Sequence, residues 1–270
     1  MKDLPAYVDV RDDTMREGLQ IESWEIPVEE KLRLLDALGD TGLKTISIGS
    51  FASPKWTPQM ACIDEIAERF LPKPGIKYTA AVFNRQGFLR ADKYYPKIDV
   101  RSKDFVTHVE VGRIFAMRNY NRTPEQMMTS AEGTVARAKQ SGATSGAIAV
   151  GNPFGSNFEG DASLEEAISV IEMVMDKWHA QDLPVSACRI IDDMGAAMPH
   201  TLAEILDILQ QRWPEIVDYG LHLHNQRGMA SICYYEALRM GVTHFDTSLG
   251  GLGGCPYCGN GRSAGHVPTE

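Results

Sequence analysis

The chain has 270 residues and a formal net charge of −9 at pH 7, with 43% hydrophobic and 23% charged residues. This is an ordinary globular composition, and the length allows one large α/β domain or two smaller ones. The negative charge, which no basic run interrupts, argues against a nucleic-acid binder.

The sequence gives no sign of a secreted or membrane protein. No apolar run approaches the length of about 18 residues that marks a membrane-spanning helix. Residues 1–5 lack an apolar signal segment. Five scattered cysteines, an odd number, indicate a reducing compartment. We therefore expect a cytoplasmic protein with no membrane or nucleic-acid partner.

Short apolar runs alternate with amphipathic stretches along the whole chain, the pattern of strands and helices in turn. Strands are predicted at residues 7–10, 45–48, 78–83, 105–111, 145–150, 185–191, 217–224 and 244–248. Helices are predicted at residues 27–38, 60–70, 123–140, 163–180, 202–213 and 229–240, with a shorter one after Asn84. Thr123 with Gln126, and Ser163 with Glu166, have the spacing of helix-capping boxes.

Eight strands alternating with helices, at about 30 residues per unit, fit a (β/α)8 TIM barrel. A doubly wound open sheet is the alternative, but eight regular units favour closure. No Pro/Gly/Ser-rich linker divides the series, so we expect residues 1–270 to form a single catalytic domain. We expect the helix that closes the barrel after the eighth strand to be absent from residues 1–270, so that it belongs to a longer chain or comes from elsewhere.

The most informative pair of residues is His222-x-His224, at the end of the seventh predicted strand. Alternate side chains of a strand share a face, so these two imidazoles can hold one divalent metal. Two ordinary polar residues at a strand end are the alternative interpretation.

Charged pairs follow two other predicted strands. Near the first, Glu17 can ligate a metal, and Arg16 can clamp a carbonyl or carboxylate group. A surface ion pair is the alternative. Asp192 and Asp193 end the sixth strand, where they either orient a ligand or a histidine or cap the following turn.

Residues 249–259 form a glycine-rich segment, for which we expect a mobile loop with an exposed backbone. Cys255 at its base can donate a proton. Cys255-x-x-Cys258 also allows a redox or zinc interpretation, but a single such pair is half a zinc set. His266 lies just beyond and offers a nitrogen to a metal; a surface histidine is the alternative.

Three segments of the chain resemble the 3-hydroxy-3-methylglutaryl-CoA lyases, within the wider group of metal-dependent barrel lyases and Claisen-type synthases. They are residues 16–22 (REGLQIE), 50–60 (SFASPKWTPQM) and 251–257 (GLGGCPY). The resemblance extends over essentially the whole chain, and His222-x-His224 falls where that family keeps its metal histidines.

The resemblance implies a role for each of these residues. Arg16 would polarise the thioester carbonyl, and Cys255 would take part in proton transfer. Asp192 would be the family's rim aspartate. Glu17, His222 and His224 would bind a divalent metal, Mg²⁺ or Mn²⁺, with His222 also placed in the catalytic centre. The implied partner is a CoA thioester, and we expect a homo-oligomer, a dimer or higher.

The sequence departs from the family at three positions. Glu17 replaces an aspartate, Ser47 a catalytic glutamate, and His266 a metal-ligating asparagine. A set of Glu17, His222, His224 and His266 is rich in nitrogen, which favours Zn²⁺, Mn²⁺ or Fe²⁺ over Mg²⁺.

The expected function is therefore a metal-dependent carbon–carbon lyase that cleaves a tertiary 3-hydroxyacyl-CoA, similar to 3-hydroxy-3-methylglutaryl-CoA, into an acyl-CoA and a keto acid. The loss of the carboxylate at Ser47 leaves open an aldolase or Claisen-type synthase acting on a 2-oxo acid. A metal-binding barrel without catalysis is the third alternative.

Overall fold

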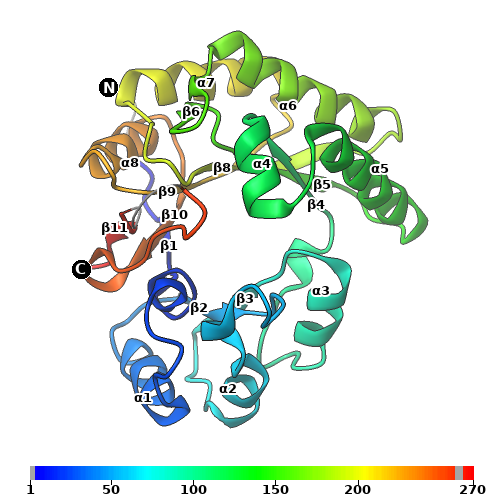
Figure 1. Cartoon of the computed structure of the whole chain (residues 1–270). Helices are drawn as coiled ribbons and strands as arrows, with labels where there is room; N and C mark the ends of the chain where they lie inside the picture. Colours follow the sequence, from blue (N-terminus) through cyan, green and yellow to red (C-terminus); the bar gives the residue numbers. More distant parts are fainter. Residues whose placement is uncertain (1–3, 259–263) are drawn as a thin grey trace. The chain divides into compact units, whose positions relative to one another are not determined.

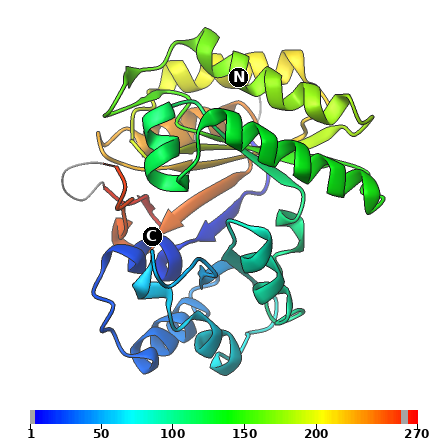
Figure 2. The same cartoon turned by 45° about the vertical axis from the view of Figure 1, so that its right-hand side comes forward.

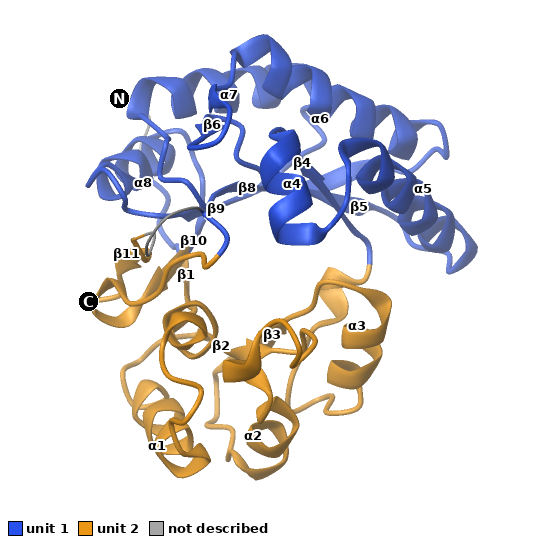
Figure 3. Ribbon diagram, viewed as in Figure 1, with its two compact units in different colours: residues 1–8, 105–245, 257–263 blue, residues 9–104, 246–256, 264–270 orange. Residues whose placement is uncertain are grey.

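The computed structural model describes residues 4–258 and 264–270 (Figure 1). Residues 1–3, which belong to the stretch 1–5 that lacks an apolar signal segment, lie outside the described residues. So does Gly259, the last residue of the predicted glycine-rich loop. The chain divides into two compact units, coloured separately in Figure 3. Unit 1 comprises residues 1–8, 105–245 and 257–263, and unit 2 comprises residues 9–104, 246–256 and 264–270.

Strands and helices alternate through both units. The strands are β1 (Asp9–Asp12), β2 (Thr45–Ser50), β3 (Lys77–Ala81), β4 (Val106–Glu110), β5 (Gly146–Gly151), β6 (Gly155–Ser156), β7 (Gly160–Asp161), β8 (Val185–Asp192), β9 (Asp218–Leu223), β10 (His244–Ser248) and β11 (Val267–Pro268). The α-helices are α1 (Val28–Leu38), α2 (Ile63–Arg69), α3 (Arg85–Asp92), α4 (Arg113–Tyr120), α5 (Pro124–Gln140), α6 (Leu164–His179), α7 (Pro199–Arg212) and α8 (Ala230–Arg239).

The main sheet has the strand order β3-β2-β1-β10-β9-β8-β5-β4, and β11 pairs in parallel with β10. Its eight principal strands are parallel, whereas β6 and β7 form a small antiparallel pair. Strand β10 begins in unit 1 and ends in unit 2. Parallel strands joined through helices confirm the predicted (β/α)8 class. The single catalytic domain stays a prediction.

In unit 1, helices α5, α6 and α7 run along one face of the strands (Figures 1 and 2). Trp178 of α6 is fully buried, and its indole Nε1 donates a hydrogen bond to Thr107 Oγ1 of β4 at 3.0 Å. The ring lies against Gly146 of β5, where a Cβ atom would come within 2.2 Å of it. The small residue therefore lets the helix pack closely on the sheet.

Unit 2 has a hydrophobic core of its own. Ile46 and Ile48 of β2 are fully buried and belong to the same cluster as Leu35 of α1 and Ile63 of α2. Apolar side chains of α1 and α2 thus pack in one cluster with those of β2.

Most of the predicted elements are confirmed, and so are both capping boxes. The prediction for the first strand was two residues early, because β1 runs from Asp9 to Asp12. Helix α4 and the β6–β7 pair were not predicted. Within residues 249–258 and 264–270 no α-helix follows β10. No helix in the described ranges is long and apolar enough to cross a membrane.

Candidate active site

His222 and His224 share one face at the end of β9, as predicted from strand alternation. Their ring centroids are 5.5 Å apart, and the intervening Leu223 is fully buried. The backbone N–H of His224 donates to the carbonyl oxygen of Asp192 at 3.0 Å, which continues the pairing of β8 with β9. Both histidines are buried, so unit 1 presents two imidazoles in fixed positions.

The two aspartates after β8 have different surroundings. The carboxylate oxygens of Asp192 accept hydrogen bonds from the N–H groups of Ala196 and Ala197, at 3.1 and 2.8 Å. Burial raises the pKa of Asp192 to about 6, although these hydrogen bonds oppose the rise. Asp193 instead has its Oδ1 atom 3.6 Å from His224 Nε2. Asp192 thus caps the turn, whereas Asp193 contacts a histidine.

In unit 2, Arg16 and Glu17 lie on a short π-helical turn, Thr14–Gly18, which follows β1 directly. Glu17 is 1% exposed, so it is not part of a surface ion pair. The guanidinium of Arg16 contacts the Glu17 carboxylate and lies 3.5 Å from Asp13 Oδ2. Gln20 Nε2 donates to Glu17 Oε1 at 2.7 Å. Two carboxylates therefore fix the orientation of Arg16.

The glycine-rich segment differs from the exposed loop that we expected. Gly253, Gly254 and Cys255 are buried, and the Gly254 carbonyl oxygen accepts a hydrogen bond from Gln20 Nε2 at 3.2 Å. Gly253 has φ +118°, and a Cβ atom there would lie 2.8 Å from the Glu17 carbonyl oxygen. Only glycine allows this backbone to pass so close to the turn that carries Glu17.

The remaining predicted residues are buried as well. His266, in unit 2, is 1% exposed and immediately precedes β11, so the surface-histidine alternative is wrong. The Cys258 thiol, in unit 1, donates to the Asp193 carbonyl oxygen at 3.2 Å. All five cysteines lie within the described residues, and each is a free thiol. Ser47 of β2 is 1% exposed.

Sequence reasoning missed several polar residues that are buried or half-buried. On β4, the ring of His108 lies 2.8 Å from the Tyr120 hydroxyl, and burial lowers the pKa of His108 to about 4. Glu110 is two residues along the same strand. In unit 2, burial and the charge of Arg11 lower the pKa of Lys103 to about 7. The signal for the β4 pair was present, since His108 and Glu110 have the two-residue spacing that places side chains on one face of a strand.

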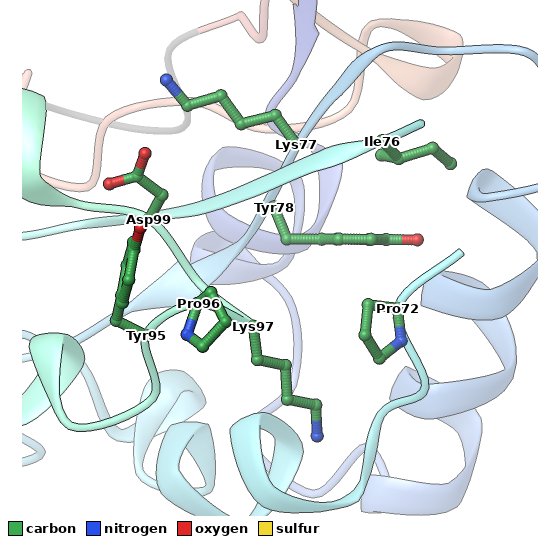
Figure 4. Close-up of a pocket in the computed structure, with 8 residues that line it drawn as sticks. All are labelled: Pro72, Ile76, Lys77, Tyr78, Tyr95, Pro96, Lys97 and Asp99. Atoms are coloured by element: carbon green, nitrogen blue, oxygen red, sulfur yellow. The ribbon is translucent and has the colours of Figure 1, made fainter. Parts of the chain in front are cut away.

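Unit 2 also has a cavity of about 490 Å³, which none of the candidate site residues lines (Figure 4). Lys77 and Tyr78, at the amino-terminal end of β3, line it together with Tyr95 and Lys97. Active sites of this fold lie at the carboxyl ends of the strands. The cavity therefore does not belong to the candidate active site.

Known proteins similar to this chain agree with the fold. The model of the HMGL-like family matches residues 7–270. The hydroxymethylglutaryl-CoA lyase of Pseudomonas mevalonii is 30% identical over 255 residues, which cover 94% of this chain and 79% of that protein. The (R)-citramalyl-CoA lyase of Chloroflexus aurantiacus is 28% identical over 276 residues, which cover 97% of this chain and 81% of that protein.

Solved structures of HMG-CoA lyases are also similar to this chain. The HMG-CoA lyase of Bacillus subtilis superimposes with a TM-score of 0.79 and 28% identity, covering 98% of this chain and 84% of that one. An HMG-CoA lyase from Acinetobacter baumannii, in complex with coenzyme A and 3-methylmalate, has a TM-score of 0.79 and 26% identity, covering 99% and 82%. The protein is thus a TIM-barrel carbon–carbon lyase. The chain belongs to the HMGL-like family.

Proposed function

We propose that the protein cleaves a CoA thioester of a tertiary 3-hydroxy acid, of the 3-hydroxy-3-methylglutaryl type, into an acyl-CoA and a keto acid. The observation that carries the proposal is the family match over residues 7–270, with relatives named as lyases of two such thioesters. A homo-oligomer and a cytoplasmic location are part of this proposal.

The donor groups fit a divalent metal. His222 and His224 offer two buried imidazoles from one strand face, and Glu17 and His266 are a buried carboxylate and a buried imidazole. We infer that these four residues hold the ion. Three imidazoles favour Mn²⁺, Zn²⁺ or Fe²⁺ over Mg²⁺. When bound, the metal would acidify the hydroxyl group of the substrate.

Arg16 is the residue proposed to stabilise the developing charge. Its guanidinium is held by Glu17 and Asp13 and lies 5.7 Å from the centre of the Phe83 ring. A base takes the hydroxyl proton, the C3 oxygen becomes a carbonyl oxygen, and the electron pair of the C2–C3 bond moves toward the thioester. Negative charge then collects on the thioester oxygen, where a preorganised cation is most effective.

Cys255 is proposed to complete the reaction. The enolate that leaves as part of the acyl-CoA must take one proton at C2. Cys255 is buried in the segment whose Gly253 packs against Glu17, so its thiol belongs to the same end of unit 2 as Arg16. Asp192, by capping its turn, positions Asp193 beside His224.

Turnover of thioesters tests the proposal. Wild type and Arg16→Met are incubated with 3-hydroxy-3-methylglutaryl-CoA and with citramalyl-CoA, each with Mg²⁺, Mn²⁺ or Zn²⁺, and acetyl-CoA is measured. We expect wild type to cleave one of them, and Arg16→Met to be slower by about 10²–10³-fold. Equal rates for the two proteins would contradict the role of Arg16.

The alternative is aldol or Claisen-type chemistry on a 2-oxo acid. It is favoured by one observation, the buried Ser47 on β2 at the position where the family resemblance implies a glutamate. The same incubations with acetyl-CoA and a 2-oxo acid distinguish the two reactions. Consumption of the 2-oxo acid without cleavage of either thioester would replace the proposed function with this one.

A further inference from the structure

Glu110, the last residue of β4, faces away from the helices of unit 1. Thr107 faces them, because its Oγ1 atom accepts the hydrogen bond of Trp178 of α6. Side chains alternate along a strand, so His108 and Glu110 lie on the opposite face. Strand alternation puts His222 and His224 together on one face of β9 as well. The charge of Asp193, which lies 3.6 Å from His224, acts on Glu110.

The structure holds one oxygen of this carboxyl group firmly. Asn152 Nδ2 donates to Glu110 Oε1 at 3.0 Å, and Asn152 Oδ1 accepts the N–H of Met194 at 3.3 Å. Asn152 is fully buried and has φ +47°, a conformation that side chains other than asparagine and aspartate rarely adopt. The position of Glu110 is thus tied to the turn that follows β8.

The other oxygen is accommodated without being bonded. Gly151 pairs with Glu110 across β4 and β5, and a Cβ atom on Gly151 would lie 2.1 Å from Glu110 Oε2. Glu110 is 2% exposed, and Oε2 has no hydrogen-bond partner among the described residues. A buried polar atom of this kind requires an explanation, and in an active site a ligand group is the usual one.

The charges around Glu110 restrict the kind of ligand group that can form a hydrogen bond with its Oε2 atom. Burial, and then the charge of Asp193, raise the pKa of Glu110 well above its ordinary value, so the surroundings favour the protonated form of this carboxyl over the charged one. Asp192 and Glu159 add further negative charge. An anionic group would be repelled there, and the protonated form of the carboxyl is no counterion for a cation. A hydroxyl group can both donate to and accept from a protonated carboxyl.

We propose that Glu110 is a specificity-determining residue, and that its Oε2 forms a hydrogen bond with a hydroxyl group on the acyl branch of the substrate. This inference rests on the proposed lyase function. The preferred thioester would carry a hydroxymethyl branch at C3 where 3-hydroxy-3-methylglutaryl-CoA carries a methyl. A methyl group in that place leaves Oε2 unsatisfied, which is how polar sites reject apolar analogues.

Two thioesters that differ by this hydroxyl test the inference. Rates of cleavage of 3-hydroxy-3-(hydroxymethyl)glutaryl-CoA and 3-hydroxy-3-methylglutaryl-CoA are compared for wild type and Glu110→Met, with Mn²⁺ present. We expect wild type to prefer the hydroxylated thioester at least tenfold in kcat/KM, and Glu110→Met to lose the preference. The same change at Glu165, exposed on the first turn of α6, is the control and should leave the preference intact. Equal preference in wild type and Glu110→Met would overturn the inference.

A binding measurement separates this inference from the lyase function. If neither thioester is cleaved, the proposed function fails for these substrates, and calorimetric titration with the two product acids still tests Glu110. The acids are 4-hydroxyacetoacetate and acetoacetate. Tighter binding of the hydroxylated acid by at least tenfold, lost in Glu110→Met, would support the role of Glu110. Equal affinities for the two acids would overturn it.

Discussion

The rings of His222 and His224 are positioned by the backbone of β9 and the N–H···O bond from His224 to Asp192. Replacing both with Ala should abolish metal binding while unit 1 stays folded, because neither ring fills the core between sheet and helices. Metal analysis after dialysis against Mn²⁺, with circular dichroism, measures both effects. His200→Ala, exposed on α7, is the control. Full metal content in the double variant would mean that the site lies elsewhere.

Cys255 and Cys258 should respond differently to the same substitution. Cys255→Ser should lower kcat by about 10²-fold with a small change in KM, because a proton-transfer defect is felt in the transition state. Cys258→Ser should be mild, since a serine hydroxyl can also donate to the Asp193 carbonyl oxygen. Steady-state kinetics of both variants provide the measurement. Equal loss of activity together with released zinc would instead support a metal site at the two cysteines.

Glu110 should make stability depend on pH. Its pKa is raised in the folded state by burial, so its stabilising contribution is complete below the unfolded pKa of about 4.3 and is lost as pH rises through the folded pKa. Glu110→Gln cannot titrate. The Tm of this variant minus that of wild type should therefore increase from pH 5 to pH 8. Glu165→Gln, exposed, should show no such trend; a constant difference for Glu110→Gln would mean that the carboxyl is not protonated when folded.

At the scale of elements, the packing of α6 on β5 depends on Gly146. Gly146→Ala should destabilise unit 1 by about 1–3 kcal/mol, because its Cβ would meet the Trp178 ring at 2.2 Å. Gly133→Ala in α5 is the matched control. Nothing lies within 4 Å of that Cβ, so it should stabilise by about 0.5–1 kcal/mol through helix propensity. Urea unfolding of both variants measures this, and equal effects would contradict the packing.

The elements that the sequence predicted are those with local signals. Helices α5 and α6 begin at capping boxes within four residues. Helix α4 has no such signal, because the carboxylate of Glu159, 45 residues away along the chain, accepts the N–H of Ile114 in its first turn. A helix cap supplied by a residue so distant in the sequence cannot be predicted from the residues next to the helix. Strand β1 was misplaced because the buried Asp12 and the charged Arg11, paired with Asp246, look like loop residues.

At the scale of the whole molecule, the strand ends and the family motifs pointed to Arg16, Glu17, the two histidines and Cys255. The burial of His266 could not be predicted, because it depends on β11 pairing with β10. Glu110 was also missed. Its importance depends on Asn152 and Gly151 in the neighbouring strand, which a one-dimensional pattern does not reveal.

The distribution of the five thiols over the molecule makes it suitable for labelling at a single position. Cys62, the residue before α2, is partly exposed, and the other four cysteines are buried. Burial raises the pKa of Cys188 to about 12 and of Cys233 to about 11, which removes their reactivity. A disulfide reagent should therefore detect one fast thiol in the native protein and five after unfolding. Cys62→Ser should eliminate the fast reaction; a second fast thiol would show that one of the four buried cysteines becomes accessible in the native protein. A fluorophore or spin label attached at Cys62 would then report on unit 2 without altering any residue proposed to act in catalysis.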